Sequence, residues 1–159
     1  MSRTKKQVNA LVVAQYFLKR AQDEGEKITN KKLQKLVYYA QVWSLVINKE
    51  RLFRESIEAW VHGPAIPSLY RRFKGFESNP ITTDLSDIDF SFSKKQSELL
   101  DDVWEVYGKY DAEYLEALTH SELPWREARE GLTAAEPSSR KIDLNKAREY
   151  YERKLKESQ

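Results

Sequence analysis

The sequence predicts a mainly α-helical protein: a single compact domain of about six to eight helices around a central buried helix at residues 30–47. It also allows one short β-hairpin. Two observations lead to this prediction. First, residues 30–47 carry apolar side chains at helical spacing over most of the helix circumference, namely Leu33, Leu36, Val37, Ala40 and Ile47, with aromatic residues between them. Second, several further apolar segments begin with a helix-capping residue. A helix that is apolar on most sides packs against others on several sides, so we take residues 30–47 as the centre.

The composition supports one globular domain spanning residues 1–159. The 159 residues are 40% hydrophobic and 33% charged, which is typical of a folded protein and not of a disordered one. Cysteine is absent, so disulfides and thiolate chemistry are excluded. The basic residues 1–6 precede no uninterrupted apolar stretch, and we expect neither a signal peptide nor a membrane-spanning helix. We therefore expect a cytoplasmic protein.

In the first half of the chain, the periodicity predicts a helix over about residues 8–22, paired antiparallel with the central helix. Its predicted apolar side comprises Val8, Leu11, Val12 and Leu18. Thr29 is placed to cap the central helix, which carries one polar strip formed by Gln34, Gln41 and Ser44. An extended segment follows near Ile57, and Pro67 is placed to open a short helix that ends at Gly75.

In the second half, residues 76–92 are rich in turn-forming residues and predict a surface loop, in which we place the optional hairpin. Ser93 and Gln96 match a capping box that opens the next helix. Asp111 is placed to cap a helix with Tyr114, Leu115 and Leu118 on its buried side. A short helix follows the Pro124 turn, and Asp143 is placed to begin a last helix at about residues 144–157.

Charge is distributed unevenly although the net charge is only +2. Residues 1–74 are strongly basic and residues 75–130 strongly acidic. Such asymmetry is found in interfaces, but it also arises when two charged surfaces face each other within one fold. We favour the second interpretation.

The stretch with the most candidate functional residues is 60–67, Trp-Val-His-Gly-Pro-Ala-Ile-Pro. His62 there could serve as a general base or a metal ligand. No catalytic partner accompanies it at a recognisable spacing, so we favour a rigid linker in which Trp60 fills the core and His62 hydrogen-bonds the backbone. His120 is placed near a helix C-terminus, where it complements the dipole. We expect no catalytic residues, no metal site and no cofactor.

Basic side chains raise the alternative of nucleic-acid binding. Arg71, Arg72 and Lys74 alternate with Tyr70 and Phe73, and Lys31, Lys32 and Lys35 add to the positive charge. The near-neutral domain argues against this alternative. Four carboxylates, those of Glu58, Asp101, Asp102 and Glu105, have no spacing that fixes any two together.

Three stretches, residues 33–41, 58–70 and 118–125, resemble the Panacea domain family of SocA/GepA-like phage-associated proteins. The similarity covers about residues 8–130, and the C-terminal helix is in keeping with it. Where the family pattern has Val after Gly-Pro, this chain has Ala65. The motif residues, which are either scaffold or docking surface, are Lys35, Tyr38, Trp60, His62, Gly63, Pro64 and Trp125.

The resemblance implies an antitoxin without enzymatic activity. Family members are encoded beside small toxins, often on prophages, and neutralise the cognate toxin by direct protein–protein binding. One member instead resembles a proteolytic adaptor that hands its toxin to an ATP-dependent protease, so this alternative stays open beside a nucleic-acid-binding autoregulator. As partner-binding residues we select Tyr70, Arg71, Arg72 and Lys74, beside the Gly63–Pro67 turn.

Overall fold

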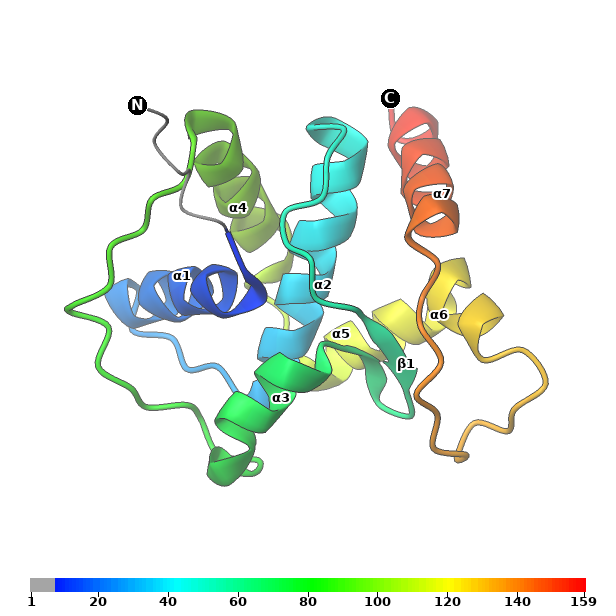
Figure 1. The fold of residues 1–159 in the computed structure, drawn as a ribbon, viewed down its shortest axis with the longest axis horizontal. Coiled ribbons are helices and arrows are strands. Elements are labelled where there is room, and N and C mark those ends of the chain that lie inside the picture. Colours follow the sequence, from blue (N-terminus) through cyan, green and yellow to red (C-terminus); the bar gives the residue numbers. More distant parts are fainter. Residues whose placement is uncertain (1–7) are drawn as a thin grey trace, which may run out of the picture.

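The computed structural model describes residues 8–159 and contains seven α-helices and one β-hairpin in that range (Figure 1). The basic residues 1–6 discussed above lie outside the described residues. The elements in chain order are α1 (Ala10–Asp23), α2 (Asn30–Ile47), β1 (Glu58–Trp60), β2 (Gly63–Ala65), α3 (Pro67–Phe73), the 3-10 turn η1 (Lys74–Phe76), α4 (Lys94–Tyr107), α5 (Ala112–Ser121), α6 (Leu123–Ala128) and α7 (Leu144–Glu157). The predicted mainly helical fold is confirmed.

Helix α2 is the centre of the fold, as predicted. It contacts α1, α3, α4, α5, α7 and β2, and most of its residues are buried. The Thr29 side chain caps it by accepting a hydrogen bond from the backbone N–H of Lys32. Packing on all sides, more than intrinsic helix propensity, stabilises such a helix, because most helical stability in proteins comes from tertiary packing.

The polar strip of α2 is buried and holds the segment that connects α2 to α3. The Gln41 amide accepts from the backbone N–H of Leu52 at 2.7 Å and donates to the Phe53 carbonyl at 2.7 Å. Ser44 donates to the Glu50 carbonyl at 2.8 Å. Gln34 accepts from the Ile66 N–H at 2.8 Å. These side chains satisfy backbone groups that irregular structure would otherwise leave unpaired in the interior.

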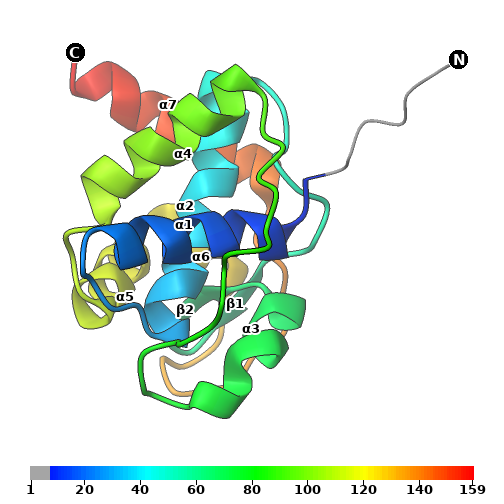
Figure 2. The same ribbon diagram turned by 90° about the vertical axis from the view of Figure 1, so that its left-hand side faces the viewer.

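Helix α1 differs from the prediction in two ways. Figures 1 and 2 show it crossing α2, where an antiparallel pair was expected. Its buried residues are Ala10, Val13, Ala14, Phe17, Leu18 and Ala21, whereas Val8, Leu11 and Val12 are only half-buried. The small Ala10, Ala14 and Ala21 side chains lie on the inner face, where they allow close approach. Of the predicted apolar side only Leu18 is buried, and the alanines gave no strong apolar pattern for the rest of the inner face.

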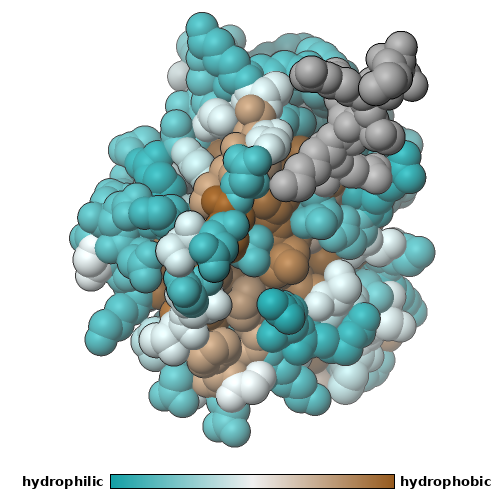
Figure 3. Space-filling view, turned by 60° about the vertical axis from the view of Figure 1, so that its left-hand side comes forward, coloured by the Kyte–Doolittle hydropathy of each residue, from teal (hydrophilic) through white to brown (hydrophobic). Residues whose placement is uncertain are grey.

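Residues 77–93 form an irregular strap, and the prediction that placed the hairpin here is wrong. The hairpin is instead β1–β2, with Glu58 paired to Ala65 and Trp60 to Gly63. The strap runs past α1 (Figure 2) and leaves the partly buried Leu11, Ile81, Ile88 and Phe92 packed against the core. Figure 3 shows an apolar band on this side of the molecule.

The caps of α4, α5 and α7 are as predicted. Ser93 and Gln96 form the capping box of α4, Asp111 caps α5, and Asp143 caps α7. The predicted buried side of α5 is correct for Leu115 but wrong for Tyr114, which is 49% exposed and stacks on Tyr110. In residues 8–159 we find no helix with both the length and the apolar character required to cross a bilayer.

The two oppositely charged halves of the chain meet within the fold. Arg20 on α1 pairs with Asp101 at 2.5 Å and with Glu105 at 3.4 Å on α4. Lys31 on α2 pairs with Glu113 at 3.9 Å and with Glu116 on α5. Part of the charge asymmetry is thus compensated within the fold.

Candidate functional site

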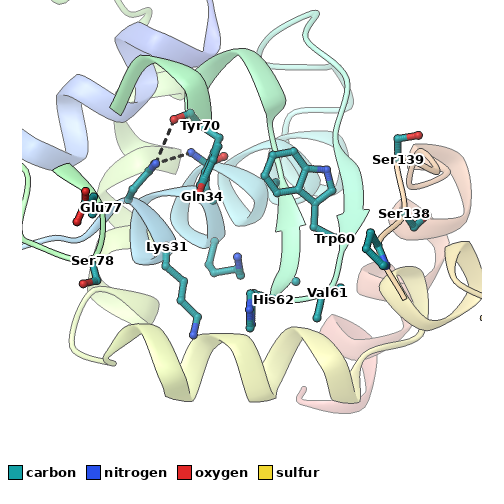
Figure 4. Close-up of a pocket in the computed structure, with 15 residues that line it drawn as sticks. Lys31, Gln34, Trp60, Val61, His62, Tyr70, Glu77, Ser78, Ser138 and Ser139 are labelled. Carbon is teal, nitrogen blue, oxygen red and sulfur yellow. Dashed lines mark hydrogen bonds between the residues drawn. The ribbon is translucent and has the colours of Figure 1, made fainter. Parts of the chain in front are cut away.

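A pocket of about 790 Å³ opens between the N-terminal half of α2, the hairpin, α3 and the loop at residues 137–139 (Figure 4). Its lining includes Lys31, Gln34, Lys35, Trp60, His62 and Tyr70. Glu77 and Ser78 lie at one end of the lining and Ser138 and Ser139 at the other, so the pocket is elongated (Figure 4). Its volume is in the range of sites that bind small molecules or parts of a partner.

Lys35 lies at the floor of this pocket and is only 2% exposed. Its ammonium donates to the Pro64 carbonyl at 3.1 Å, which is its one hydrogen bond to the described residues. Burial lowers the pKa of Lys35 to about 7, while the nearby Glu116 carboxylate partly opposes that shift. Lys35 is therefore not part of an exposed basic surface. Lys32 is also buried, and its ammonium donates to the Gly108 carbonyl at 2.6 Å.

Gly63 allows the hairpin to cover the Lys35 side chain. Its φ is +108°, a conformation that residues with a side chain rarely adopt. A Cβ at this position would lie 2.5 Å from Cε of Lys35 and 2.9 Å from Oγ1 of Thr119. Gly63 is thus required by both the backbone turn and the close approach of the lysine, and Pro64 supplies the carbonyl that the lysine binds.

Trp60 and Tyr70 form the aromatic wall of the pocket. Their ring centroids are 5.0 Å apart in an edge-to-face arrangement, and both side chains are only half-buried. The prediction that Trp60 fills the core is wrong: its indole N–H donates to the Glu58 carboxylate at 2.9 Å. Successive residues of a strand point to opposite faces, so in β1 Ala59 is buried in the interior while Trp60 faces the pocket.

His62 lies at the rim, and its side chain is 73% exposed. Its Nδ1 lies 3.3 Å from a carboxylate oxygen of Glu116, and Glu116 also pairs with Lys31. Burial raises the pKa of Glu116, but the hydrogen bonds from Lys31 and His62 outweigh it and lower that pKa. The expected hydrogen bond from His62 to the backbone is not the contact observed. Glu116 on α5 thus links its own helix to α2 through Lys31 and to the hairpin through His62. It was not selected from the sequence, because nothing in its local pattern distinguishes it.

Trp125 on α6 supports the hairpin from behind. Its indole N–H donates to the Trp60 carbonyl at 2.7 Å, and its ring stacks on His120 with centroids 3.9 Å apart. His120 lies in the last turn of α5 as expected, but burial lowers its pKa, so packing dominates over a charge–dipole interaction. Arg129, which sequence reasoning missed, donates to the Ala59 carbonyl at 2.9 Å.

Tyr38 belongs to a separate, closed cluster of hydroxyl groups around Glu122. Tyr38 and Tyr151 hydroxyls lie 2.9 Å apart, and the Glu122 carboxylate accepts from Tyr39 at 2.7 Å and from Tyr151 at 2.9 Å. Burial raises the pKa of Glu122 and of all three tyrosines. The cluster ties α2, α7 and the α5–α6 junction together and does not line the pocket.

The basic residues of α3 lie beside the pocket. Arg71, Arg72 and Lys74 are exposed, and none forms an ion pair with another described residue. Tyr70 on the same helix contributes to the pocket wall. The helix thus carries one side chain into the pocket and three cations next to it.

The remaining candidates are not brought together into a site. Asp101 and Glu105 both bind Arg20, so they act as ion-pair partners. Among residues 8–159 no group of three or more His, Asp or Glu side chains is arranged to hold a metal ion.

The fold brings the three sequence motifs together: residues of the first two line the pocket, and Trp125 of the third binds the hairpin from behind. In a comparison with protein families, residues 33–126 match the family described as "Antitoxin SocA-like, Panacea domain". The chain belongs to this family. Comparisons with curated proteins and with solved structures found no match.

Proposed function

We propose that this protein is the antitoxin of a cytoplasmic toxin–antitoxin system, which neutralises a small protein toxin, encoded next to it, by direct binding. Membership of an antitoxin-like family carries this proposal. The protein acts by covering an active site or a substrate-entry surface of the toxin, and not by catalysis.

We place the docking surface at the pocket and the adjacent face of α3. The exposed cations Arg71, Arg72 and Lys74 and the half-buried Tyr70 support this placement. Arginine and tyrosine are enriched among the few residues that dominate binding energy in interfaces. An interface of ordinary size buries about 1,600 Å², which exceeds the pocket mouth and takes in α3.

The first experiment is a co-expression assay. The adjacent small reading frame is expressed from a tightly controlled promoter, alone and with this protein, and colonies are counted. Toxicity alone and survival with both proteins support the proposal, and co-purification then tests direct binding. A harmless neighbour, or equal killing in the presence of well-expressed protein, contradicts it for that pair.

The placement of the interface has its own test. Reversing both charges, Arg71→Glu with Arg72→Glu, should weaken rescue and co-purification without lowering the melting temperature. Arg153→Glu with Lys156→Glu on α7 is the matched control, because both residues are exposed and lie away from the pocket. Rescue that is equal in the two double variants would place the interface elsewhere.

Two alternatives from the sequence remain open. If the protein is a proteolytic adaptor, rescue should require an ATP-dependent protease and the toxin should be short-lived in cells that contain both proteins. If it is a nucleic-acid-binding autoregulator through the exposed cations of α3, it should shift its own upstream DNA in a salt-dependent manner. Absence of a shift at low salt would exclude the second alternative.

A further inference from the structure

The Lys35 ammonium is unusual among the groups of the pocket, because most of its N–H donors find no acceptor in the protein. An ammonium carries three N–H donors, and among the described residues only the Pro64 carbonyl accepts from it. Its side chain is nearly fully buried. Burying a cation is costly unless hydrogen bonds and an opposite charge compensate for it.

No carboxylate of the described residues pairs with Lys35. The nearest candidate, Glu116, is occupied by Lys31 on one side and by His62 on the other. The pocket floor thus offers an amine whose hydrogen-bonding capacity is unused and whose charged form a bound carboxylate would stabilise. An incoming carboxylate is the group that this arrangement fits, because it supplies both the charge and the acceptors.

The walls of the pocket indicate which chemical groups a ligand should carry beside the carboxylate. Trp60 and Tyr70 present half-buried aromatic faces, and Val61 and Ala65 add apolar surface. The lining extends from Glu77 and Ser78 to Ser138 and Ser139, which lie at opposite ends in Figure 4. An elongated shape fits a chain passing through better than a compact molecule.

We propose that the pocket receives an extended segment of a protein partner, in which the side chain of an Asp or Glu binds Lys35 and a neighbouring apolar side chain packs on Trp60 and Tyr70. The exposed Arg71 and Arg72 beside the pocket favour further acidic residues in the same segment. That the partner is a toxin rests on the proposed function, whereas the chemistry of the segment is inferred from the pocket itself.

The test uses a phage-displayed library of random dodecapeptides, selected on the wild-type protein and counter-selected on Lys35→Met. The methionine keeps an unbranched side chain of similar length and removes the charge. We expect enriched peptides to contain Asp or Glu next to an aromatic or aliphatic residue. A synthetic copy of an enriched peptide, measured by calorimetry, should bind Lys35→Met at least about tenfold more weakly than wild type.

Lys32→Met is the matched control, since Lys32 is a second buried lysine on α2 that does not line the pocket. It should bind the peptide as the wild type does. If Lys35→Met fails to fold, replacing the peptide's Asp or Glu by Asn or Gln tests the same contact on wild-type protein, with a loss of similar size expected. The Trp60→Ala protein should bind the original peptide, with its Asp or Glu in place, more weakly than the wild type does.

Three results would overturn the inference: enriched peptides that lack an acidic residue, equal binding to wild type and Lys35→Met, or no enrichment over the counter-selection. The selection requires no toxin, so its failure is distinct from failure of the colony assay. Rescue by wild type and equally by Lys35→Met would leave the antitoxin function standing and reject the pocket as its docking site.

Discussion

Lys35 and Tyr38 are one helical turn apart on α2, belong to the same sequence motif and are almost equally buried, at 2% and 1% exposure. Their surroundings differ. The Tyr38 hydroxyl lies in a closed network with Tyr151 and Glu122, where every member has a partner. Lys35 lies at the floor of an open pocket with a single acceptor.

Trp125 and Trp60 differ instead in burial and in where their N–H groups are bound. Trp125 is 8% exposed and its N–H is bound inside the protein by the backbone of Trp60. Trp60 is half-buried and its N–H is bound by Glu58 at the surface. The motifs therefore divide into residues that stabilise the fold and residues that shape a pocket. Burial separates the two tryptophans, whereas Lys35 and Tyr38 differ only in their supply of hydrogen-bond partners. The following predictions test that division, from the largest expected effect to the smallest.

Trp125→Ala should cost about 3–5 kcal/mol of unfolding free energy, because it removes a large buried side chain and frees the Trp60 carbonyl. Urea denaturation measures this loss. A change below about 1 kcal/mol, smaller than a typical core truncation, would show that Trp125 does not support the hairpin.

Gly63→Ala should cost about 2–4 kcal/mol, because the new side chain combines an unfavourable φ with a steric clash against Lys35. The melting temperature and the denaturant midpoint measure it. Gly131→Ala is the control for backbone strain alone, since its φ is +88° but no atom lies within 4 Å of a Cβ there. Equal losses of stability in the two variants would show that the clash with Lys35 does not contribute to the effect.

Lys35 should make stability depend on pH. Its pKa falls from an ordinary 10.5 to about 7 in the folded protein, so between these values the unfolded chain binds the extra proton. Stability should therefore rise with pH in this window, by up to about 1.4 kcal/mol per pH unit. The buried tyrosines, whose pKa values are raised, reverse the trend above pH 10. Chemical denaturation from pH 7 to 9.5 measures how the unfolding free energy changes with pH. Lys35→Met should nearly abolish this change, whereas Lys32→Met should keep part of it.

Trp60→Ala should cost only about 1–2 kcal/mol, since part of the residue is already exposed to water, but it should impair partner binding. Denaturation and co-purification together give the two values. A loss as large as that of Trp125→Ala, or unimpaired binding, would move Trp60 from the pocket group to the scaffold group.

Arg71→Glu with Arg72→Glu should change stability by less than about 0.5 kcal/mol, because both side chains are exposed and without ion-pair partners among the described residues. Thermal unfolding checks this, and the rescue assay then reports on binding alone. A large drop in melting temperature would show that α3 depends on these residues.

Local sequence signals predicted much of the fold. The central helix and the caps at Thr29, Ser93, Asp111 and Asp143 were predicted correctly, because capping and helical periodicity depend on residues within a few positions of one another. The inner face of α1 was not, because alanines pack against a neighbour without leaving a strong apolar pattern. The position of the hairpin was also missed, since residues 60–67 were interpreted as a rigid linker and only pairing with β1 makes Gly63–Ala65 a strand.

For the site, the sequence identified the motif residues but not their separation into two groups. It could not show that Lys35 is buried beneath Gly63, or that Glu116 joins Lys31 and His62, because these residues are far apart in the chain. By itself the sequence determined the helical class, the central helix and the resemblance to an antitoxin family. Only the tertiary structure decided which polar groups find partners in the interior and which remain available in a pocket, since that depends on contacts between distant segments.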